Sequence, residues 1–385
     1  MSSLLGTRLS ILMGQAYPLP PVPDLTRNLK SVTIDHPTEG RSTFTMSFRA
    51  ERGRINPWDY GLLGTRFGGA MPPTRVVLTA LFGPKPEVLM DGIIQSVSLQ
   101  PGDGAGAPDQ ISVSGEDLTV LMDQEELSRE RMAPTLEGQV FEVLAPYLRY
   151  GMVPEIIPAT TQDLFDPLHM VILQQGTDYA FVSELAEQAG HVFKLIPGPF
   201  PTTSRVFWGP EAVLRARAQV APQPAISVNL GPASNASGLT FSFHSAAVEE
   251  VAGAVLRSGP VSATPREKMP LSRIDAVKLV GPHIRKGFSE QLAQTRNASH
   301  ARARAQALAD MSMSDAVMVE GTLDVLRYGG VLKPLGLVGV RGAGLSFDGE
   351  YFVNGVTHNI SEGRYTQSFT LSRSGLGARS LRVRP

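Results

Sequence analysis

The chain has 385 residues, with 35 lysines and arginines against 36 aspartates and glutamates, so its net charge does not point to nucleic acid or an anionic membrane as a partner. It contains no cysteine, which excludes disulfide frameworks, thiolate metal sites and thiol nucleophiles. Its 38 glycines and 30 prolines are typical of many short strands joined by turns.

The N-terminal segment, residues 1–27, is apolar and then proline-rich, ending in "PLPPVPD". It lacks a basic start, and Arg8 interrupts its apolar part, so it does not have the pattern of a signal peptide. No apolar run in the chain approaches the ~20 residues that a membrane helix needs, and we expect no membrane insertion. We interpret residues 1–27 as a docking arm, with a disordered tail as the alternative.

Residues 28–115 have the pattern of an antiparallel β-domain. In "STFTMSFRA", Phe44, Met46 and Phe48 alternate with small polar residues, a period of two. The stretches "SVTIDH", "DGIIQSVSLQ" and "QISVSG" are strand-like, and "RVVLTALF" is apolar on both faces, which is typical of a strand covered on both sides. We predict a first tube-like sandwich or barrel here.

Residues 116–215 predict a smaller α+β domain. A helix begins near Thr135 in "TLEGQVFEVLAPYLRYG", with a kink at Pro146 and an end at Gly151.

A second helix in the same region follows Thr177 or Asp178, either of which can cap its first turn, and Gly190 ends it. The next stretch, "HVFKLI", returns to strand. The buried stripe of this second helix is expected to consist of Phe181, Val182, Leu185, Ala186 and Ala189.

Residues 216–375 predict a second tube-like β-domain, interrupted by an alanine-rich helix over residues 286–311. The strands expected around that helix are "GLTFSFHS", "VMVEGTLDVL", "GLVGVRG", "EYFVNGVTHNI" and "RYTQSFTLSR". The strings "TFTMSF" and "TQSFTLS" have the same alternation of small polar with apolar residues, which hints that the two β-domains are related. Residues 376–385 form a basic C-terminal tail.

The most regular stretch, residues 347–374, predicts a β-hairpin whose turn is "SEGR", with Gly363 free to adopt a positive φ. His358 is expected to share its face with Phe352, Val356 and Ile360. We interpret His358 as a hydrogen-bonded strand residue; the alternative is a catalytic or metal-binding histidine.

Searches for a chemical site return weak candidates. None of the seven histidines has another histidine three to five residues away, so metal-ligand spacing is missing. Asp166 and His169 in "DPLHM" form a possible acid–base pair, but they can equally be ordinary polar residues of a loop. We interpret Asp123, Glu125 and Glu126 as a solvated surface. The sequence supports no enzyme, and we predict no catalytic, cofactor-binding or metal-binding residue.

Basic residues gather in two places, and we interpret both as solvent-exposed, with contact to an acidic partner or to passing nucleic acid as the alternative. The first group is Arg285, Lys286, Arg296, Arg302 and Arg304. The second is Arg373, Arg379, Arg382 and Arg384.

Three motifs, taken in order, resemble the phage late-control-gene-D and baseplate-hub family, which is similar to the N-terminal part of type VI secretion spike proteins. They are "GEDLTVLMDQEE" (115–126), "QQGTDYAFVSELAEQAGHVF" (174–193) and "FDGEYFVNGVTHNISEGRYTQSFTLSR" (347–373). Together they place residues 28–375 in the order of the family, although Thr177 stands where the spike proteins commonly carry serine.

This resemblance implies a non-enzymatic hub that forms a homotrimer and joins a hexameric inner tube to a trimeric spike. The spike is expected to be a separate protein, and tape-measure and baseplate wedge proteins are further candidate partners. Nucleic acid would at most pass through the lumen. The resemblance also implies assembly in the bacterial cytoplasm into a phage tail, virion or tail-like particle. The alternatives from the residues are a receptor- or carbohydrate-binding tail protein and a cell-wall hydrolase on a β scaffold.

Overall fold

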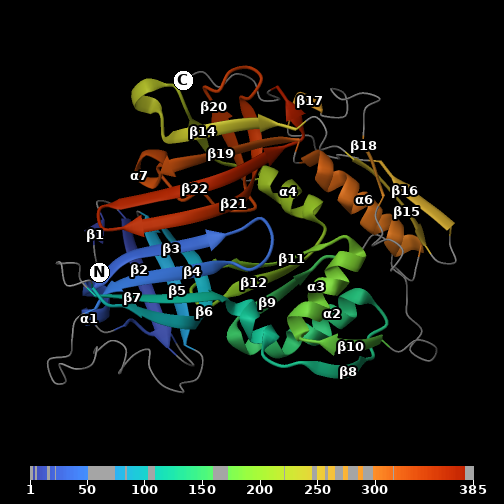
Figure 1. The fold of residues 1–385 in the computed structure, drawn as a ribbon, viewed down its shortest axis with the longest axis horizontal. Helices are drawn as coiled ribbons and strands as arrows, with labels where there is room; N and C mark the ends of the chain where they lie inside the picture. The colour runs from blue at the N-terminus through green and yellow to red at the C-terminus, as the bar shows by residue number, and fades with distance from the viewer. Residues whose placement is uncertain are drawn as a thin grey trace.

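A computed structural model gives the fold of this chain (Figure 1). The residues that it describes are 3–4, 7–14, 18–21, 23–50, 74–82, 85–102, 109–158, 172–220, 222–244, 249–255, 259–264, 272–275, 285–288, 298–314 and 316–377.

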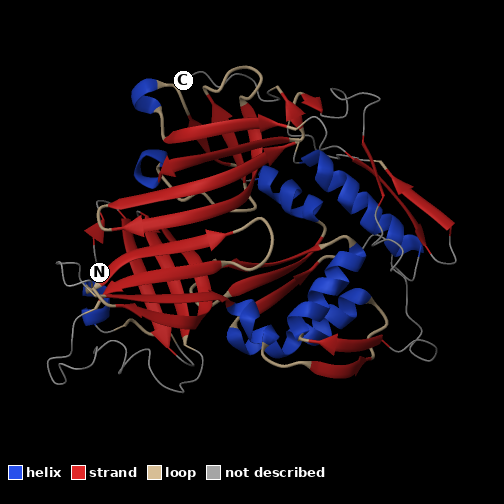
Figure 2. Cartoon of the chain, in the orientation of Figure 1, coloured by secondary structure: helices blue, strands red, loops and turns tan. Residues whose placement is uncertain are grey.

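One sheet of 13 strands contains most of the β-structure and runs through both halves of the chain (Figures 1 and 2). Its order is β1-β2-β5-β6-β7-β4-β3-β21-β22-β19-β14, and β20 pairs with both β21 and β13. Its strands are β1 (Ser3–Leu4), β2 (Thr7–Gly14), β3 (Leu29–His36), β4 (Thr43–Arg49), β5 (Arg75–Phe82), β6 (Lys85–Gln100), β7 (Gln110–Asp117), β13 (Gln223–Ser227), β14 (Ala236–Phe243), β19 (Val317–Asp324), β20 (Leu337–Arg341), β21 (Gly349–Ser361) and β22 (Arg364–Arg373).

Strands β2 to β7 form what we call the first module. If these six strands are numbered one to six in chain order, their order across the sheet is one, four, five, six, three, two. Every neighbouring pair in the first module is antiparallel. The fourth, fifth and sixth strands form a continuous meander because short connections favour antiparallel neighbours.

Strands β13, β14, β19, β20, β21 and β22 form the second module, and their order across the sheet is also one, four, five, six, three, two. Four of its five pairings are antiparallel; β13 and β20 are parallel. The chain therefore builds the same strand arrangement twice. This confirms the predicted pair of similar β-domains, although they share one sheet because β21 is long enough to pair with β20 and then with β3.

The two modules also share a β-bulge at the same place in the fifth strand. The register of β6 against β7 shifts between Ile94 and Ser96, and that of β21 against β22 shifts between Val353 and Gly355. At the bulge, the amide of Ile94 donates to a carbonyl next to β5, and the amide of Val353 donates to one next to β20. The bulges therefore align the modules residue by residue.

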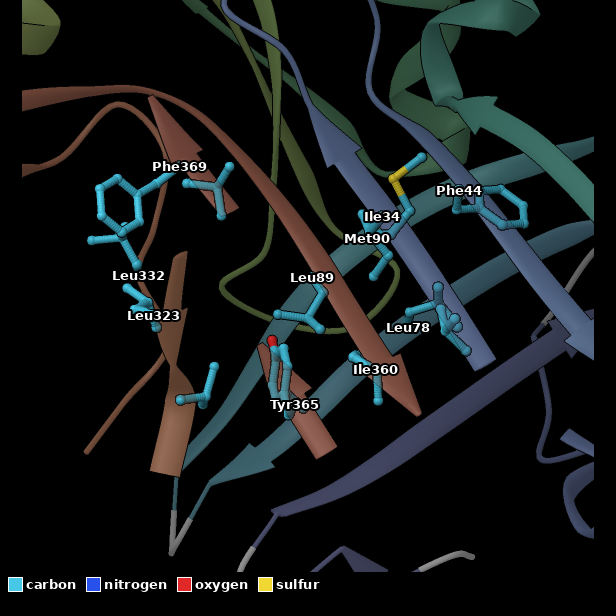
Figure 3. Close-up of a cluster of buried hydrophobic side chains, with 14 of the residues drawn as sticks. Ile34, Phe44, Leu78, Leu89, Met90, Leu323, Leu332, Ile360, Tyr365 and Phe369 are labelled. Atoms are coloured by element: carbon cyan, nitrogen blue, oxygen red, sulfur yellow. The ribbon is translucent and has the colours of Figure 1, made fainter. Parts of the chain in front are cut away.

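The core is continuous between the modules. Side chains from both modules, among them Ile34, Phe44 and Leu78 from the first and Ile360 and Phe369 from the second, lie in one buried cluster (Figure 3). The two modules therefore share one hydrophobic core.

The α+β region lies beside the sheet and confirms the predicted second helix closely. Helix α3 (Asp178–Ala189) begins after Thr177, whose side chain accepts a hydrogen bond from the amide of Ala180 at 3.2 Å. It ends at Gly190, which has φ of 66°. All five residues expected in its stripe are buried. The neighbouring strands are β8 (Leu127–Arg131), β9 (Met152–Ile156), β10 (Ile172–Gly176), β11 (Val192–Pro197) and β12 (Ser204–Gly209).

The first predicted helix is shorter than expected. Helix α2 (Leu136–Leu144) begins after Thr135, and the chain then continues as a 3₁₀-helix, η3 (Ala145–Tyr150), that ends at Gly151. Pro146 lies in the first turn of η3 and has no N–H to continue the α-helical pattern. Another 3₁₀-helix, η2 (Leu118–Asp123), precedes this region, and α4 (Glu211–Val220) follows it.

A small sheet inserted in the second module packs against α6 (Ala298–Ser314). Its strands are β15 (Glu249–Val255), β16 (Gly259–Ala263) and β18 (Arg285–Phe288). Strand β18 lies where the predicted helix 286–311 would begin, so that start is wrong. Gly287 is a poor helix former, and pairing with β15 satisfies the backbone there instead. The remaining elements are α1 (Pro23–Arg27), η4 (Gly231–Ala233), β17 (Ile274–Asp275), α7 (Val325–Tyr328) and β23 (Gly375–Leu376).

The predicted docking arm is part of the sheet of its own chain. Strand β2 pairs with β5 over its full length, from Thr7 to Gly14. Ile11 is buried in the shared core, and Leu9 and Met13 pack against it. The alternation of these three residues was the signal for a strand.

No helix in the described part of the chain is long and apolar enough to cross a membrane.

Candidate assembly interface

The two modules meet where residues 31–36 of β3 pair antiparallel with residues 356–361 of β21, and we call this pairing the internal joint. Ile34 lies opposite His358, and Asp35 lies opposite Thr357. The side chains of the second pair are hydrogen-bonded, with 2.6 Å between the Thr357 hydroxyl and the Asp35 carboxylate. The joint places the second strand of one module on the fifth strand of the other.

On the core side of the joint, His358 is 1% exposed and belongs to a closed hydrogen-bond network. Its Nδ1 atom lies 2.8 Å from the hydroxyl oxygen of Tyr365 and 3.3 Å from Nε2 of Gln367. The amide of Gln367 also bonds both backbone groups of Leu332, accepting from its N–H at 2.9 Å and donating to its carbonyl at 2.8 Å. His358 is therefore a hydrogen-bonded strand residue, as the sequence predicted.

A second buried histidine, His36, lies beside His358 with 5.4 Å between the ring centroids. Its Nδ1 atom lies 2.9 Å from the hydroxyl oxygen of Ser42. Burial lowers the pKa of His36 to about 4 and that of His358 well below its usual value, because the charged imidazolium loses its hydration. Both rings are neutral at pH 7, and the joint holds no buried charge there.

The opposite face of the sheet consists largely of short hydroxyl side chains in register across the joint. One row crosses five strands, and a second row runs beside it on the same face. The first row is Ser98, Ser112, Ser47, Ser31 and Ser361; the second is Ser96, Ser114, Thr45, Thr33, Asn359 and Thr366. This face is a polar but mostly uncharged wall.

Several strand edges have no partner strand among the described residues, and two of them matter for the joint between the modules. The first is the outer edge of β14, which ends the order of the large sheet. The second belongs to residues 97–100 of β6, whose edge away from β7 continues past the end of β5. Unpaired strand edges present rows of free N–H and C=O groups that can pair with another chain. These edges are the candidate assembly interface.

The α+β region is attached to the first module by a buried ion pair. Nε of Arg75 donates to Oδ1 of Asp91 at 2.7 Å, and Nη2 donates to Oδ2 at 2.6 Å and to the carbonyl of Thr202 at 2.9 Å. Burial raises the pKa of Asp91, and the bonds from Arg75 and Ser204 oppose that rise. This contact fixes β12 and its turn against the sheet.

The acidic residues predicted as a solvated surface are exposed. They are Asp123, Glu125 and Glu126. Asp123, however, lies 2.9 Å from a guanidinium nitrogen of Arg41 and accepts a hydrogen bond from Thr177, and these bonds lower its pKa. Asp123 is therefore an exposed residue, as predicted, that also forms an ion pair with Arg41 from a distant part of the sequence.

The other candidates do not come together. Asp166 and His169 lie outside the described residues. In the first basic group, Lys286 and Arg302 are exposed, while Arg304 pairs with Glu187 at 3.1 Å. No three His, Asp or Glu side chains in the described residues are grouped so as to hold a metal ion.

Arg373 departs from the predicted exposed tail. Its side chain is fully buried beneath Tyr351 and donates to the carbonyls of Ser346 and Asp348. Arg285 has no described side chain, and Arg296, Arg379, Arg382 and Arg384 lie outside the described residues.

The prediction that Phe352 shares a face of the sheet with His358, Val356 and Ile360 was also wrong. Val356 and Ile360 lie in the shared core, but Phe352 packs in a separate cluster with Phe207 and Leu214. The bulge after Val353 inserts one residue, so that side chains before it point to the opposite face.

Comparison with known proteins gives matches to solved structures. No protein-family model matches this sequence, and no curated protein does. A tail protein from Neisseria meningitidis MC58 matches with a TM-score of 0.61 and 16% identity, over 97% of this chain and 98% of that one. This chain has the fold of phage tail proteins.

Two further matches extend the range of that tail-protein fold. The 43 kDa tail protein of prophage MuSo2 from Shewanella oneidensis matches with a TM-score of 0.60 and 12% identity, over 95% of this chain and 99% of that one. A type VI secretion component from E. coli, described as similar to T4 bacteriophage tail proteins, matches with a TM-score of 0.52 and 12% identity, over 92% and 76% of the two chains. The structural neighbours are thus phage tail and type VI secretion proteins.

Proposed function

We propose that this chain is the structural hub of a contractile tail or related injection machine, a trimeric adaptor between a hexameric inner tube and a trimeric spike. One observation carries the proposal: the same six-strand order occurs twice in one chain, and a single sheet joins the two copies. Three such chains contain six similar modules. They can present approximate sixfold symmetry to a tube while keeping threefold symmetry toward a spike.

The distribution of side chains supports a ring with the hydroxyl face inside. The apolar face that carries Ile34 and Val356 is covered by the shared core. This covering layer needs more circumference than the bare face, so it belongs on the outside of a closed ring. The rows of serine and threonine would then line the lumen. Short uncharged side chains would give a passing polymer few strong contacts.

The proposed partners are two further copies of this chain, the inner tube protein and a spike protein. Tape-measure and wedge proteins would contact the rest of the baseplate. The hub would act by binding its partners through surfaces of complementary shape and would not catalyse a reaction. The permanent interfaces between copies should each bury more than ~2,000 Å².

The mass of the assembled protein tests this proposal. We expect light scattering to give three times the 41.3 kDa chain mass for the chain alone, or that mass plus the mass of the spike when the two are co-expressed. A protein that stays monomeric at micromolar concentration, with its spike and tube proteins present, would overturn the hub assignment.

A further inference from the structure

The internal joint provides a template for contact between copies. It joins β3, the second strand of the first module, to β21, the fifth strand of the second module. If the roles of the two modules are exchanged, the corresponding strands are β14, the second strand of the second module, and β6, the fifth strand of the first module. Both strands have an open edge in the described part of the sheet.

The two modules can be aligned through their strand registers. The bulge equates Val97 with Val356 and Ser98 with Thr357, since each follows its bulge by the same number of residues. Stepping through β7 and β4 to β3, and through β22 and β19 to β14, equates Asp35 with Ser242.

The same alignment equates Ile34 with Phe241 and His36 with Phe243. Core-facing positions therefore match core-facing positions, and positions on the hydroxyl face match one another.

Burial differs between matched positions as a missing partner would require. In the internal joint, Ile34 and His358 are 0% and 1% exposed. Their counterparts Phe241 and Leu99 point toward the core but are only partly buried. Full burial stabilises such a side chain by about 1.5–3 kcal/mol relative to exposure, and Phe241 and Leu99 gain only part of this in the single chain.

We infer that residues 240–243 of β14 pair antiparallel with residues 97–100 of β6 in a second copy of this chain, in the register of the internal joint. Ser242 then lies opposite the partner's Ser98, and Phe241 lies opposite the partner's Leu99. Phe241 and Phe243 complete the core edge of the neighbouring first module. This inference rests on the proposed hub function and specifies its interface.

The partner has to be another copy, because the two edges cannot meet within one chain. Strands β7, β4, β3, β21, β22 and β19 separate β6 from β14 in the sheet. A contact between one edge and a different edge on the next copy is heterologous. Such contacts form a closed ring when the rotation that relates neighbouring copies is a whole fraction of a full turn. Closure would leave neither edge exposed to aggregation.

Disulfide cross-linking tests this register directly, because the natural chain has no cysteine. A chain carrying both Ser242→Cys and Ser98→Cys, purified as the assembled complex and mildly oxidised, is expected to form covalent dimers and then covalent trimers. Paired strand residues have Cα atoms about 4.5–5.5 Å apart, within the range that a disulfide spans. The matched control combines Ser242→Cys with Ser96→Cys, shifted by two residues on the same face.

The outcomes separate this inference from the proposed function. Trimers by mass in which the Ser242–Ser98 pair fails to cross-link, or cross-links no better than the control, would overturn this register and leave the hub intact. Cross-linked dimers that never close into trimers would support the pairing and contradict the trimeric hub. At least a tenfold excess of cross-linked product over the control is expected.

A second variant tests the apolar contact without cysteine chemistry. Phe241→Lys should leave the single chain folded, since this side chain is only partly buried there, but should weaken the trimer at least tenfold in concentration for half-assembly. Leu326→Lys, on an exposed residue of α7, is the matched control and should assemble normally. Unchanged assembly of Phe241→Lys would overturn the inference.

Discussion

The hydroxyl of Tyr365 donates to Nδ1 of His358 across the hairpin, with 2.8 Å between the heavy atoms. The direction of this bond follows from Gln367, whose carbonyl oxygen accepts from the Leu332 amide, so that its nitrogen must face Nδ1. Nδ1 therefore carries no proton and accepts. Tyr365→Phe removes the stronger of its two donors.

We expect Tyr365→Phe to lower the free energy of unfolding by roughly 1–3 kcal/mol, since a buried acceptor loses its hydrogen bond. Urea denaturation measures this difference. The control is Thr366→Ala, on the neighbouring residue of the hydroxyl face, and should cost under about 0.5 kcal/mol. Equal losses for the two variants would contradict the assigned network.

Acid should weaken the internal joint through its two histidines. The pKa of each is lowered in the folded protein, so between pH 6.5 and about 4 the unfolded chain binds protons that the folded chain does not. Stability therefore falls as the pH falls through this window, by up to about 1.4 kcal/mol per pH unit for each histidine.

The comparison of variants isolates this effect, because the raised pKa values of Asp91 and Asp117 act in the opposite sense as the pH falls. The stability of His36→Gln, followed by urea denaturation from pH 7 to pH 4, should depend less on pH than that of the natural chain. His244→Gln, at an exposed residue, should keep the full slope. A slope that is the same in all three proteins would rule out a contribution of His36 to the pH dependence.

Much of this fold could be predicted from residue patterns, because the signals were local. The cap at Thr177, the stop at Gly190 and the turn at Gly363 lie where the sequence placed them. Strand β2 was not predicted, because the alternation of Leu9, Ile11 and Met13 is short and lies next to a proline-rich stretch that is typical of an irregular arm.

The candidate interface could not be predicted in the same way. The open edges of β6 and β14 depend on which strands pair, and pairing joins residues far apart in the chain. The face of Phe352 depends on a bulge, which a strict period of two cannot show. The half-burial of Phe241 has meaning only beside its counterpart Ile34, once the two modules are aligned.

Gln367 should be a stronger determinant of stability than another glutamine with the same kind of contacts. Gln367→Met keeps the shape of the side chain but leaves the buried N–H and C=O groups of Leu332 without partners. We expect a loss of roughly 2–4 kcal/mol and faster amide exchange at Leu332.

The matched control is Gln223→Met. Gln223 forms hydrogen bonds with the N–H and C=O groups of Lys333, the residue that follows Leu332, at 2.8 and 2.9 Å. These bonds lie near solvent. Water can replace them, so this variant should lose under about 1 kcal/mol. Losses of the same size at the two glutamines would show that burial is not the cause.

The ion pair of Arg75 and Asp91 should behave as a buried pair in a double-mutant cycle. Arg75→Met leaves the fully buried Asp91 carboxylate without its main partner, and we expect a loss of about 3–5 kcal/mol in the free energy of unfolding. The double variant, Arg75→Met with Asp91→Leu, removes both charges and should recover most of that loss. Chemical denaturation at pH 7 measures all four proteins of the cycle.

The surface pair of Lys333 and Glu87 is the control, since its atoms are 2.7 Å apart but both side chains reach solvent. Its single variants should each cost under about 1 kcal/mol because water screens the pair. If the double variant at Arg75 and Asp91 loses as much as its two single variants combined, the desolvation of Asp91 is not what makes Arg75 necessary. The contact from Arg75 to the Thr202 carbonyl would then be the more important of its bonds, and the ion pair would serve mainly to orient the guanidinium toward the α+β region.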